Sequence, residues 1–248
     1  MKQQQPKKIT DYKAAVFDMD GVVTQTATVH ARAWKKMFDD FLRSYSQRHN
    51  LPFQEFDMES DYRDYVDGLP RFEGVHRFLA SRGIELEEGS EEDPEDSETV
   101  FGLGKRKNNY FNQVLEQEGV QVYPDWLEQV YKWRQQGMKT AIVSSSRNCR
   151  AVIAAGGVEH LFDTRVDGEV SRQLNLKGKP DPDIFIEAAN RLQVVPAEAV
   201  VFEDAVSGVQ SGKAGKFGLV VGVAHKQNHQ QLLDNGADVA VEKLTELV

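Results

Sequence analysis

Six short apolar runs recur along the chain, and several are apolar throughout instead of alternating with polar residues. Uninterrupted apolar strands are typical of a parallel sheet that is covered on both faces. Helical stretches lie between several of these runs, and the clearest are residues 147–155, 183–192 and 206–214. The alternation of strand and helix predicts a doubly wound α/β sheet. The expected strands are residues 14–18, 140–144, 164–167, 200–203, 219–223 and 238–241.

One long segment, residues 26–118, breaks this alternation because it contains no convincing parallel strand. Three stretches in it have helical spacing instead, at residues 29–46, 74–81 and 109–116. We therefore expect a small helical cap inserted after the first strand of a Rossmann-like core. The predicted divisions are a core of residues 11–27 and 119–248, a helical cap of residues 28–118, and a flexible tail of residues 1–10.

An acidic stretch, residues 85–98, lies between the predicted cap helices and contains Gly89 and Pro94. Such a stretch could bind a cation or a partner. Like charges also repel one another, however, and this stretch has little apolar surface to bury. We therefore expect an extended, solvated surface loop.

Composition narrows the class of protein. Net charge is -9 over 248 residues, which argues against binding to nucleic acid or to an anionic membrane. The only cysteine, Cys149, excludes an internal disulfide, and we expect a buried structural thiol in a reducing compartment. The first ten residues lack the apolar core of a signal peptide, and no apolar run approaches the length of a membrane span. We therefore expect a cytoplasmic protein. The sequence does not give the oligomeric state, and a monomer is assumed.

Two carboxylates, Asp18 and Asp20, follow the first apolar run one residue apart and precede Gly21. In an extended strand, residues i and i+2 point the same way, so both carboxylates would face one point. Two anions so close repel each other unless a cation is bound or one of them takes a proton. Asp18 could then be a nucleophile toward phosphorus, and Asp20 a general acid/base. The same residues would also suit a simple turn.

Polar residues end three later segments as well, at Ser144, at Lys179 and at the pair Glu203 and Asp204. The carboxyl ends of strands in an open α/β sheet share one crevice, so these residues would meet Asp18 there. Carboxylate oxygens suit Mg²⁺, and a lysine would neutralise the charge of a transition state on phosphate. The structural alternatives are a helix N-cap at Asp204 and an ordinary surface lysine.

The second strand is followed by three serines, Arg147 and Asn148, where a helix is expected to begin. Backbone N–H groups and hydroxyls at a helix N-terminus make an anion site. Serine is also a good N-cap, but three serines with Arg147 and Asn148 exceed what a cap requires. This segment is therefore a candidate phosphate site.

These residues, in this order, resemble the four motifs of the haloacid dehalogenase superfamily of phosphotransferases, and the resemblance extends from about Lys13 to Val248. The insertion after the first motif resembles the small helical cap of that superfamily. A narrower resemblance is to its β-phosphoglucomutase-like subfamily. It rests on Thr26, His30, Trp34, Arg71, residues 106–108 and residues 144–148.

The resemblance implies a role for each position. Asp18 would be the phosphorylated nucleophile and Asp20 the general acid/base. Asp18, the main-chain carbonyl of Asp20 and Asp204 would hold Mg²⁺, with Glu203 beside them. The transferring phosphoryl group would be bound by Ser144, Ser145 and Lys179. The distal phosphate would be bound by Arg71, Ser146 and Asn148, next to Arg147. The sugar would be bound by His30 and Lys107.

The implied reaction interconverts β-D-glucose 1-phosphate and glucose 6-phosphate through phospho-Asp18, with glucose 1,6-bisphosphate as intermediate and primer. Two alternatives remain open. The first is a Mg²⁺-dependent phosphatase for small sugar phosphates that uses the same core residues. The second is a non-catalytic module that senses sugar phosphates. The chain departs from the subfamily at Gln25, where an acidic residue is common, and in the acidic stretch at residues 85–98.

Overall fold

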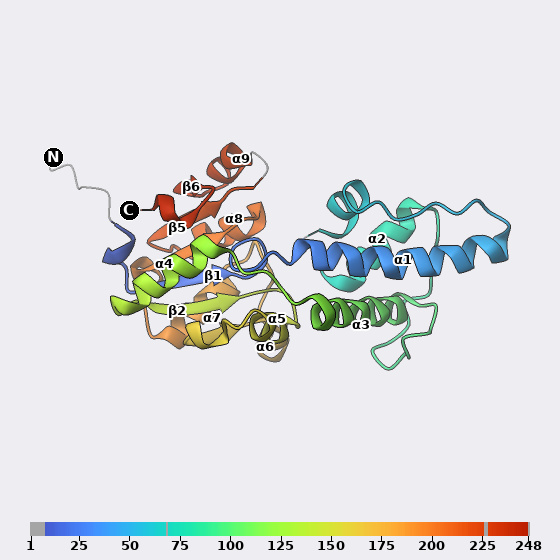
Figure 1. Cartoon of the computed structure of the whole chain (residues 1–248), viewed down its shortest axis with the longest axis horizontal. Coiled ribbons are helices and arrows are strands. Elements are labelled where there is room, and N and C mark those ends of the chain that lie inside the picture. Colours follow the sequence, from blue (N-terminus) through green and yellow to red (C-terminus); the bar gives the residue numbers. More distant parts are fainter. Residues whose placement is uncertain (1–7, 68, 226–227, 248) are drawn as a thin grey trace. The chain divides into compact units, whose positions relative to one another are not determined.

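The structure, a computed structural model, describes residues 8–67, 69–225 and 228–247. Its sheet has six parallel strands in the order β3-β2-β1-β4-β5-β6 (Figure 1). Each of the six expected strands is confirmed, with its boundaries within one residue of the prediction. The strands are β1 Ala14–Asp18, β2 Lys139–Val143, β3 Thr164–Val166, β4 Ala199–Glu203, β5 Leu219–Val223 and β6 Val239–Val241.

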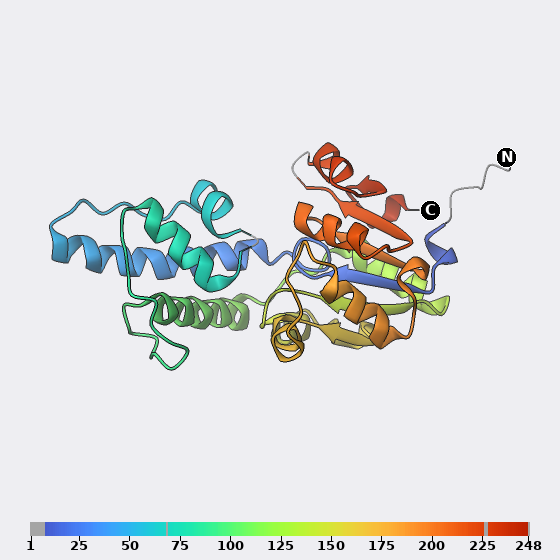
Figure 2. The same cartoon turned by 180° about the vertical axis from the view of Figure 1, so that it is seen from behind.

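Two kinds of side chain cover the two faces of the sheet. On one face, Phe17 and Phe202 stack at 4.7 Å and pack against Trp126 and Trp133 of α4, which lies in front of the strands in Figure 1. The other face is mainly aliphatic and packs against α7 and α8, the orange helices in front of the strands in Figure 2. The helices are α4 Pro124–Gln135, α5 Cys149–Ala155, α6 Gly168–Leu174, α7 Asp183–Leu192, α8 Val206–Ala214 and α9 His229–Asp234, with short 3₁₀ turns η1 Ile9–Asp11, η3 Glu159–Leu161, η4 Pro196–Glu198 and η5 Leu244–Glu246.

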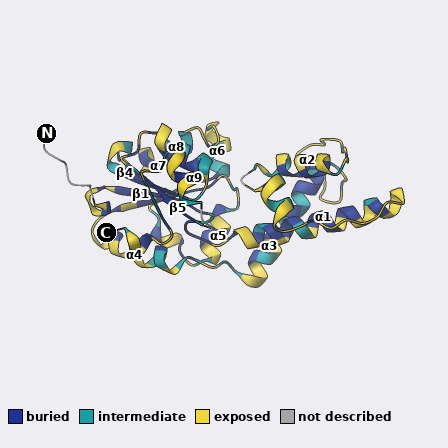
Figure 3. Ribbon diagram, turned by 90° about the horizontal axis from the view of Figure 1, so that it is seen from above, coloured by how far each residue is buried: buried dark blue, intermediate teal, exposed yellow. Residues whose placement is uncertain are grey.

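The helical insertion forms a second unit with its own core. Phe38, Phe56 and Phe78 lie within 5.3 Å of one another between ring centroids, and all three are fully buried. Buried positions, dark blue in Figure 3, recur along α1 among exposed ones. The chain divides into Met1–Thr26 with Val120–Val248, and Ala27–Gly119, one residue from each predicted boundary. The elements of this cap are α1 Ala27–His49, the π-helix η2 Tyr62–Val66, α2 Arg71–Ser81 and α3 Val100–Glu118.

The predicted flexible tail is wrong at its end. Ile9 begins a 3₁₀ turn and is buried, because Lys8 N–H donates to Asp11 at 2.9 Å and closes the turn. The rest of the tail, residues 1–7, lies outside the described residues. Cys149 is buried as expected, and burial raises the pKa of its thiol well above the ordinary value. Within the described residues, no helix is long and apolar enough to span a membrane.

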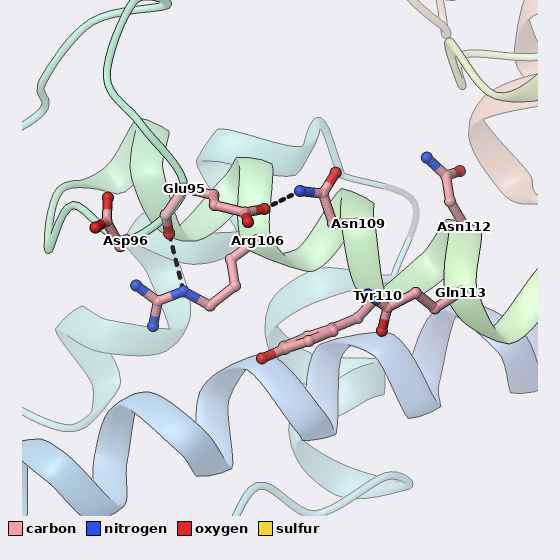
Figure 4. Close-up of a pocket in the computed structure, with 7 residues that line it drawn as sticks. All are labelled: Glu95, Asp96, Arg106, Asn109, Tyr110, Asn112 and Gln113. Atoms are coloured by element: carbon pink, nitrogen blue, oxygen red, sulfur yellow. Dashed lines mark hydrogen bonds between the residues drawn. The ribbon is translucent and has the colours of Figure 1, made fainter.

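The acidic stretch is largely exposed, as expected, but it is folded into turns instead of extended. Thr99 donates to Asp93 at 2.7 Å, and the Lys105 ammonium group of α3 donates to main-chain carbonyls of the loop. The Lys105 cation and these hydrogen bonds offset the repulsion that would otherwise extend the loop. Between the loop and α3 lies a shallow pocket of about 410 Å³ (Figure 4). None of the predicted site residues lines it; its walls are Glu95, Asp96, Arg106, Asn109, Tyr110, Asn112 and Gln113.

Candidate active site

The candidate catalytic residues of the core meet where chain order reverses in the sheet. β1 lies between β2 and β4, although β4 follows β3 in the chain. Asp18, the last residue of β1, is opposite Val143, so Ser144 follows at the same edge. Phe17 is opposite Phe202, so Glu203 is next to Asp18 on the other side. This is the point in an open α/β sheet where ligands bind.

Lys179 joins two of these strands. Its ammonium group donates to Asp18 Oδ1 and to Glu203 Oε1, and it lies 5.2 Å from the centre of the Phe185 ring. Burial alone would lower the pKa of Lys179. The neighbouring carboxylates of Asp18 and Glu203 outweigh that effect and raise the pKa above its ordinary value. Lys179 is therefore a permanent cation at this edge of the sheet.

Asp18 lies in an excess of negative charge. Burial raises the pKa of its carboxyl group to about 8, although Lys179 acts in the opposite direction. The nearby carboxylates of Glu203 and Asp20 also contribute to this raised pKa. Burial and the same group of carboxylates also raise the pKa of Asp204 well above its ordinary value. A single lysine does not balance this set, and a further cation beside Asp18 would favour its ionised form.

Glu203 has partners within the protein for both oxygens. Oε1 accepts from Lys179, and Oε2 accepts from the main-chain N–H of Ala205 at 2.9 Å. Its side chain fills the space beside Gly208, where an added Cβ would lie 1.8 Å from Oε1. Glu203 is therefore placed to hold Lys179 and the start of α8.

Asp20 lies beyond the strand, in the turn that follows it, which is the alternative that the sequence left open. β1 ends at Asp18, and the N–H groups of Val23 and Thr24 both donate to Met19 O at 3.0 Å. The turn brings Asp20 to the buried hydroxyl of Thr26, which donates to its carboxylate. Asp20 still acts electrostatically on Asp18, because its charge raises the pKa of that carboxyl.

Gly21 gives the turn its shape and makes room for Asp204. Its φ is +82°, a conformation that glycine adopts without strain. A Cβ added at Gly21 would lie 1.9 Å from Asp204 Oδ2, so the Asp204 carboxylate occupies the space above this residue. The turn after β1 and the loop after β4 are therefore in contact.

The serine run forms a turn, and the expected helix begins two residues later than predicted, at Cys149. Ser144 is buried and its Oγ accepts from the Ser146 N–H at 3.1 Å, while Ser146 Oγ accepts from the Asn148 N–H at 3.1 Å. Ser145 and Arg147 are exposed on this turn. The candidate phosphate site is thus a hydroxyl-rich turn that leads into the N-terminus of α5, where Asn148 is the N-cap.

The donor set fits Mg²⁺ in its chemistry. Asp18, Asp204 and the Asp20 carbonyl offer hard oxygen atoms, and Mg²⁺ commonly takes one or two carboxylates with water and phosphate. The raised pKa values of Asp18 and Asp204 show a surplus of negative charge that a divalent cation would offset. Among the described residues, no three His, Cys, Asp or Glu side chains converge on one point. The implied set needs only two carboxylates.

The cap brings together His30 of α1 and Lys107 of α3, which are 77 residues apart. His30 Nδ1 lies 2.8 Å from the Lys107 ammonium group, and its ring stacks on Phe111 at 4.4 Å. Lys107 is 4% exposed and lies 5.0 Å from the centre of the Trp34 ring. Burial, followed by the charges of Lys107 and Arg71, lowers the pKa of His30 well below its ordinary value. His30 is therefore neutral and accepts a hydrogen bond at Nδ1.

Arg71 completes this cap cluster. It begins α2, and its guanidinium group donates to Asn108 Oδ1 of α3 at 2.7 Å. Gly104 allows the close approach, because an added Cβ there would lie 2.5 Å from the Phe72 ring. Two cations thus gather around one neutral imidazole. We call His30, Arg71, Lys107 and Asn108 the cap cluster.

Three residues with a place in the site were not predicted from the sequence. Asp167 is buried after β3, where it caps α6 through the Glu169 and Val170 N–H groups. His225 and Asn228 follow β5 and contact the turns that carry Asp20 and Asp204. The position of Asp167 just after a strand could have suggested its role as the N-cap of α6. His225 and Asn228 belong to no sequence motif.

Comparison with known proteins agrees with this geometry. Residues 12–216 match the haloacid dehalogenase-like hydrolases. The β-phosphoglucomutase of Mycobacterium bovis is 44% identical over 98% of this chain and 93% of its own length. A phosphorylated carbohydrates phosphatase of Thermotoga maritima is 25% identical over 95% of this chain and 96% of its own. The β-phosphoglucomutase structure of Clostridium difficile shares the fold, with a TM-score of 0.73 and 23% identity over 96% of this chain and 93% of that one. The chain belongs to the haloacid dehalogenase superfamily, in its β-phosphoglucomutase-like subfamily.

Proposed function

We propose that the protein is a Mg²⁺-dependent β-phosphoglucomutase. It would interconvert β-D-glucose 1-phosphate and glucose 6-phosphate through phospho-Asp18 and glucose 1,6-bisphosphate. The core residues serve any phosphotransferase or phosphatase of this superfamily. The observation that favours the mutase is the cap cluster, where Arg71 and Lys107 supply positive charge for a second phosphate or for a charged sugar. The 44% identity to a mutase supports the same choice.

The first half of the reaction moves the phosphoryl group from Asp18 to the sugar. The bond between the Asp18 oxygen and phosphorus breaks, and a bond from the sugar 6-oxygen to phosphorus forms. Asp20 takes the hydroxyl proton, and Asp18 leaves as a carboxylate. Lys179 balances negative charge during the transfer, because it is a permanent cation beside Asp18.

The second half returns the other phosphate to Asp18. The bond between the sugar 1-oxygen and phosphorus breaks, and Asp20 gives its proton to that oxygen. Glucose 6-phosphate leaves and phospho-Asp18 is restored. Asp18, Asp204 and the Asp20 carbonyl would hold Mg²⁺. When bound, this ion supplies positive charge for the transferring phosphoryl group.

Water competes with the sugar for the aspartyl phosphate. A mutase must therefore exclude water until its sugar is bound, and conformational closure is a common means of doing so. We propose that the cap cluster recognises the sugar phosphate and makes this exclusion conditional on it. The neutral His30 would assist by keeping Lys107 in place.

The test is an assay with Mg²⁺ and β-glucose 1-phosphate, with and without a trace of glucose 1,6-bisphosphate. Glucose 6-phosphate and free phosphate are followed in parallel, and the Asp18→Asn variant serves as the blank. We expect glucose 6-phosphate to appear rapidly only with the primer and to outrun release of phosphate. Release of phosphate without isomerisation would overturn the mutase assignment.

The second candidate is a phosphatase for small sugar phosphates. It is favoured by the similarity to the Thermotoga phosphatase over nearly the whole of both chains. The same assay separates the two, because a phosphatase releases phosphate and needs no primer. The non-catalytic sensing module is disfavoured because Asp18, Asp20, Lys179 and Asp204 are all present. Binding of sugar phosphate with no turnover at all would restore it.

A further inference from the structure

The segment that follows β5 reaches the turn that carries Asp20. His225 Nε2 lies 2.6 Å from the main-chain oxygen of Gly21. A carbonyl oxygen can only accept, so Nε2 carries the hydrogen and donates it. Gly21 is the residue after Asp20, and its own N–H donates to Thr24 O at 2.9 Å. The peptide groups on both sides of Gly21 are therefore fixed.

The same segment reaches the loop that carries Asp204. The Asn228 side chain accepts from the His225 N–H at 2.8 Å and donates to Asp204 O at 3.4 Å. One amide thus connects the backbone at His225 to the backbone at Asp204. The second of these bonds is long, so we expect Asn228 to contribute less than His225.

Packing holds the imidazole ring in this orientation. The His225 ring stacks on Tyr123 with 5.6 Å between ring centroids and 21° between the planes. The Asp204 carboxylate lies above Gly21, which has no Cβ to displace it. Three segments, those of Gly21, Asp204 and His225, therefore meet behind the proposed Mg²⁺ ligands.

We propose that His225 and Asn228 are positioning residues for the cation site. Through Gly21 O and Asp204 O they fix the Asp20 carbonyl and the Asp204 carboxylate relative to each other. Groups that orient metal ligands in this way commonly change metal affinity tenfold to a hundredfold when they are removed. The inference rests on the proposed function only in that the site binds a divalent cation, which both the mutase and the phosphatase require.

The test is a titration of the full-length protein with Mn²⁺ alone, followed by the electron paramagnetic resonance signal of the free ion. In His225→Phe the ring still stacks on Tyr123, but the donor to Gly21 O is lost. In His225→Gln an amide N–H can replace that donor. His160→Phe is the matched control, because His160 also contacts a tyrosine, Tyr131, elsewhere in the core.

We expect His225→Phe to raise the Kd for Mn²⁺ about tenfold, and His225→Gln and His160→Phe to stay within about twofold of the wild type. Asn228→Ala should raise it by a smaller factor. In turnover assays, His225→Phe should need more Mg²⁺ for half-maximal rate but recover most of its kcat at saturation. The ratio of glucose 6-phosphate to free phosphate should not change.

Three results would overturn this assignment. Wild-type Kd in His225→Phe would show that the hydrogen bond to Gly21 does not position the ligands. Equal weakening in His225→Phe and His225→Gln would show that a hydrogen-bond donor at position 225 does not restore metal affinity, so the effect would not come from the bond to Gly21 O. If the wild type bound no Mn²⁺, the metal-dependent function itself would fail together with this assignment. If metal binding behaved as expected but no mutase activity appeared, only the proposed reaction would fail.

Discussion

The core site and the cap cluster have opposite charge balances. In the core, several carboxylates surround Lys179, and burial with mutual repulsion raises the pKa of Asp18 and Asp204. In the cap, Lys107 and Arg71 lie beside His30, and burial with these cations lowers the pKa of that imidazole. The two clusters therefore shift the pKa values of their buried groups in opposite directions, upward for the carboxyl groups of the core and downward for the imidazole of the cap.

This difference indicates what each region binds. The core has too much negative charge and suits a cation, with a phosphoryl group brought to Asp18. The cap has too much positive charge and suits an anion such as the phosphate of a sugar. A phosphatase needs only the core region. A mutase also needs a region that binds the sugar phosphate while the sugar is reoriented between the two phosphoryl transfers. The predictions below separate the contributions of the two regions.

The largest effect is expected at the nucleophile. Asp18→Asn removes the oxygen that is phosphorylated, so mutase and phosphatase turnover should both fall at least about a thousandfold. The variant also removes one of the crowded buried carboxylates, and its free energy of unfolding without Mg²⁺ should be equal or higher. Turnover assays and denaturant unfolding provide the two readouts. Appreciable turnover in a folded Asp18→Asn would contradict the role of Asp18.

Lys179→Met should destabilise the core strongly, because it leaves the carboxylates of Asp18 and Glu203 without their cation. The side chain of Lys179 is 11% exposed, so we expect a loss of about 3–5 kcal/mol in denaturant unfolding at neutral pH. The double variant Lys179→Met with Glu203→Gln should recover part of that stability but none of the activity. A single variant as stable as the wild type would contradict the charge balance described for the core.

Arg71→Ala tests the cap without touching the core. We expect mutase turnover to fall about a hundredfold, because loss of an orienting group misplaces the substrate. Phosphatase activity should persist, because Asp18 and Lys179 are unchanged. Arg77→Ala is the matched control, since Arg77 is exposed on the same helix. Equal losses of mutase and phosphatase turnover in Arg71→Ala would contradict this division of labour.

The smallest effect is the pH dependence of the cap. The pKa of His30 is lowered in the folded state, so the unfolded chain binds more protons below its pKa of about 6.5. The stability from neutral His30 is therefore complete above about pH 6.5 and is lost as pH falls below it, by up to about 1.4 kcal/mol per pH unit. His30→Gln should lack this dependence. The measurement is hydrogen exchange of the α1 and α3 amides in the wild type and in His30→Gln as a function of pH. Equal pH dependence of their protection in the two proteins would contradict the role of neutral His30.

The sequence was sufficient to predict those strands and core site residues whose signal lies within a few neighbouring positions of the chain. The strands are continuous apolar runs, and the core residues Asp18, Ser144, Lys179 and Glu203 lie where those runs end or in short motifs. Helices α4, α6 and α9 were not among the helical stretches predicted from the sequence. Helix α4 could have been predicted, because its buried Trp126, Val130 and Trp133 have helical spacing. Helix α6 buries no residue and α9 has six residues, so neither has a clear apolar stripe.

Contacts between distant segments were beyond what the sequence pattern can predict. His30 and Lys107 each look like ordinary surface residues, and only the packing of α1 on α3 makes them a buried pair. The same holds for His225, whose bond to Gly21 spans 204 residues and depends on the order of β1, β4 and β5 in the sheet. At Asp20 the sequence left a strand end and a turn both open, and the hydrogen bonds from the Val23 and Thr24 N–H groups to Met19 O show the turn.

The fate of the phosphoryl group on Asp18 tests the central claim most directly. The enzyme is phosphorylated with radiolabelled glucose 1,6-bisphosphate, freed of ligand, and mixed either with buffer or with β-glucose 1-phosphate before rapid quenching. We predict slow loss of label to water in buffer, and rapid transfer of label to glucose bisphosphate when the sugar phosphate is present. Rapid release of labelled phosphate at the same rate in both mixtures would contradict the account, because Asp18 would then serve a phosphatase.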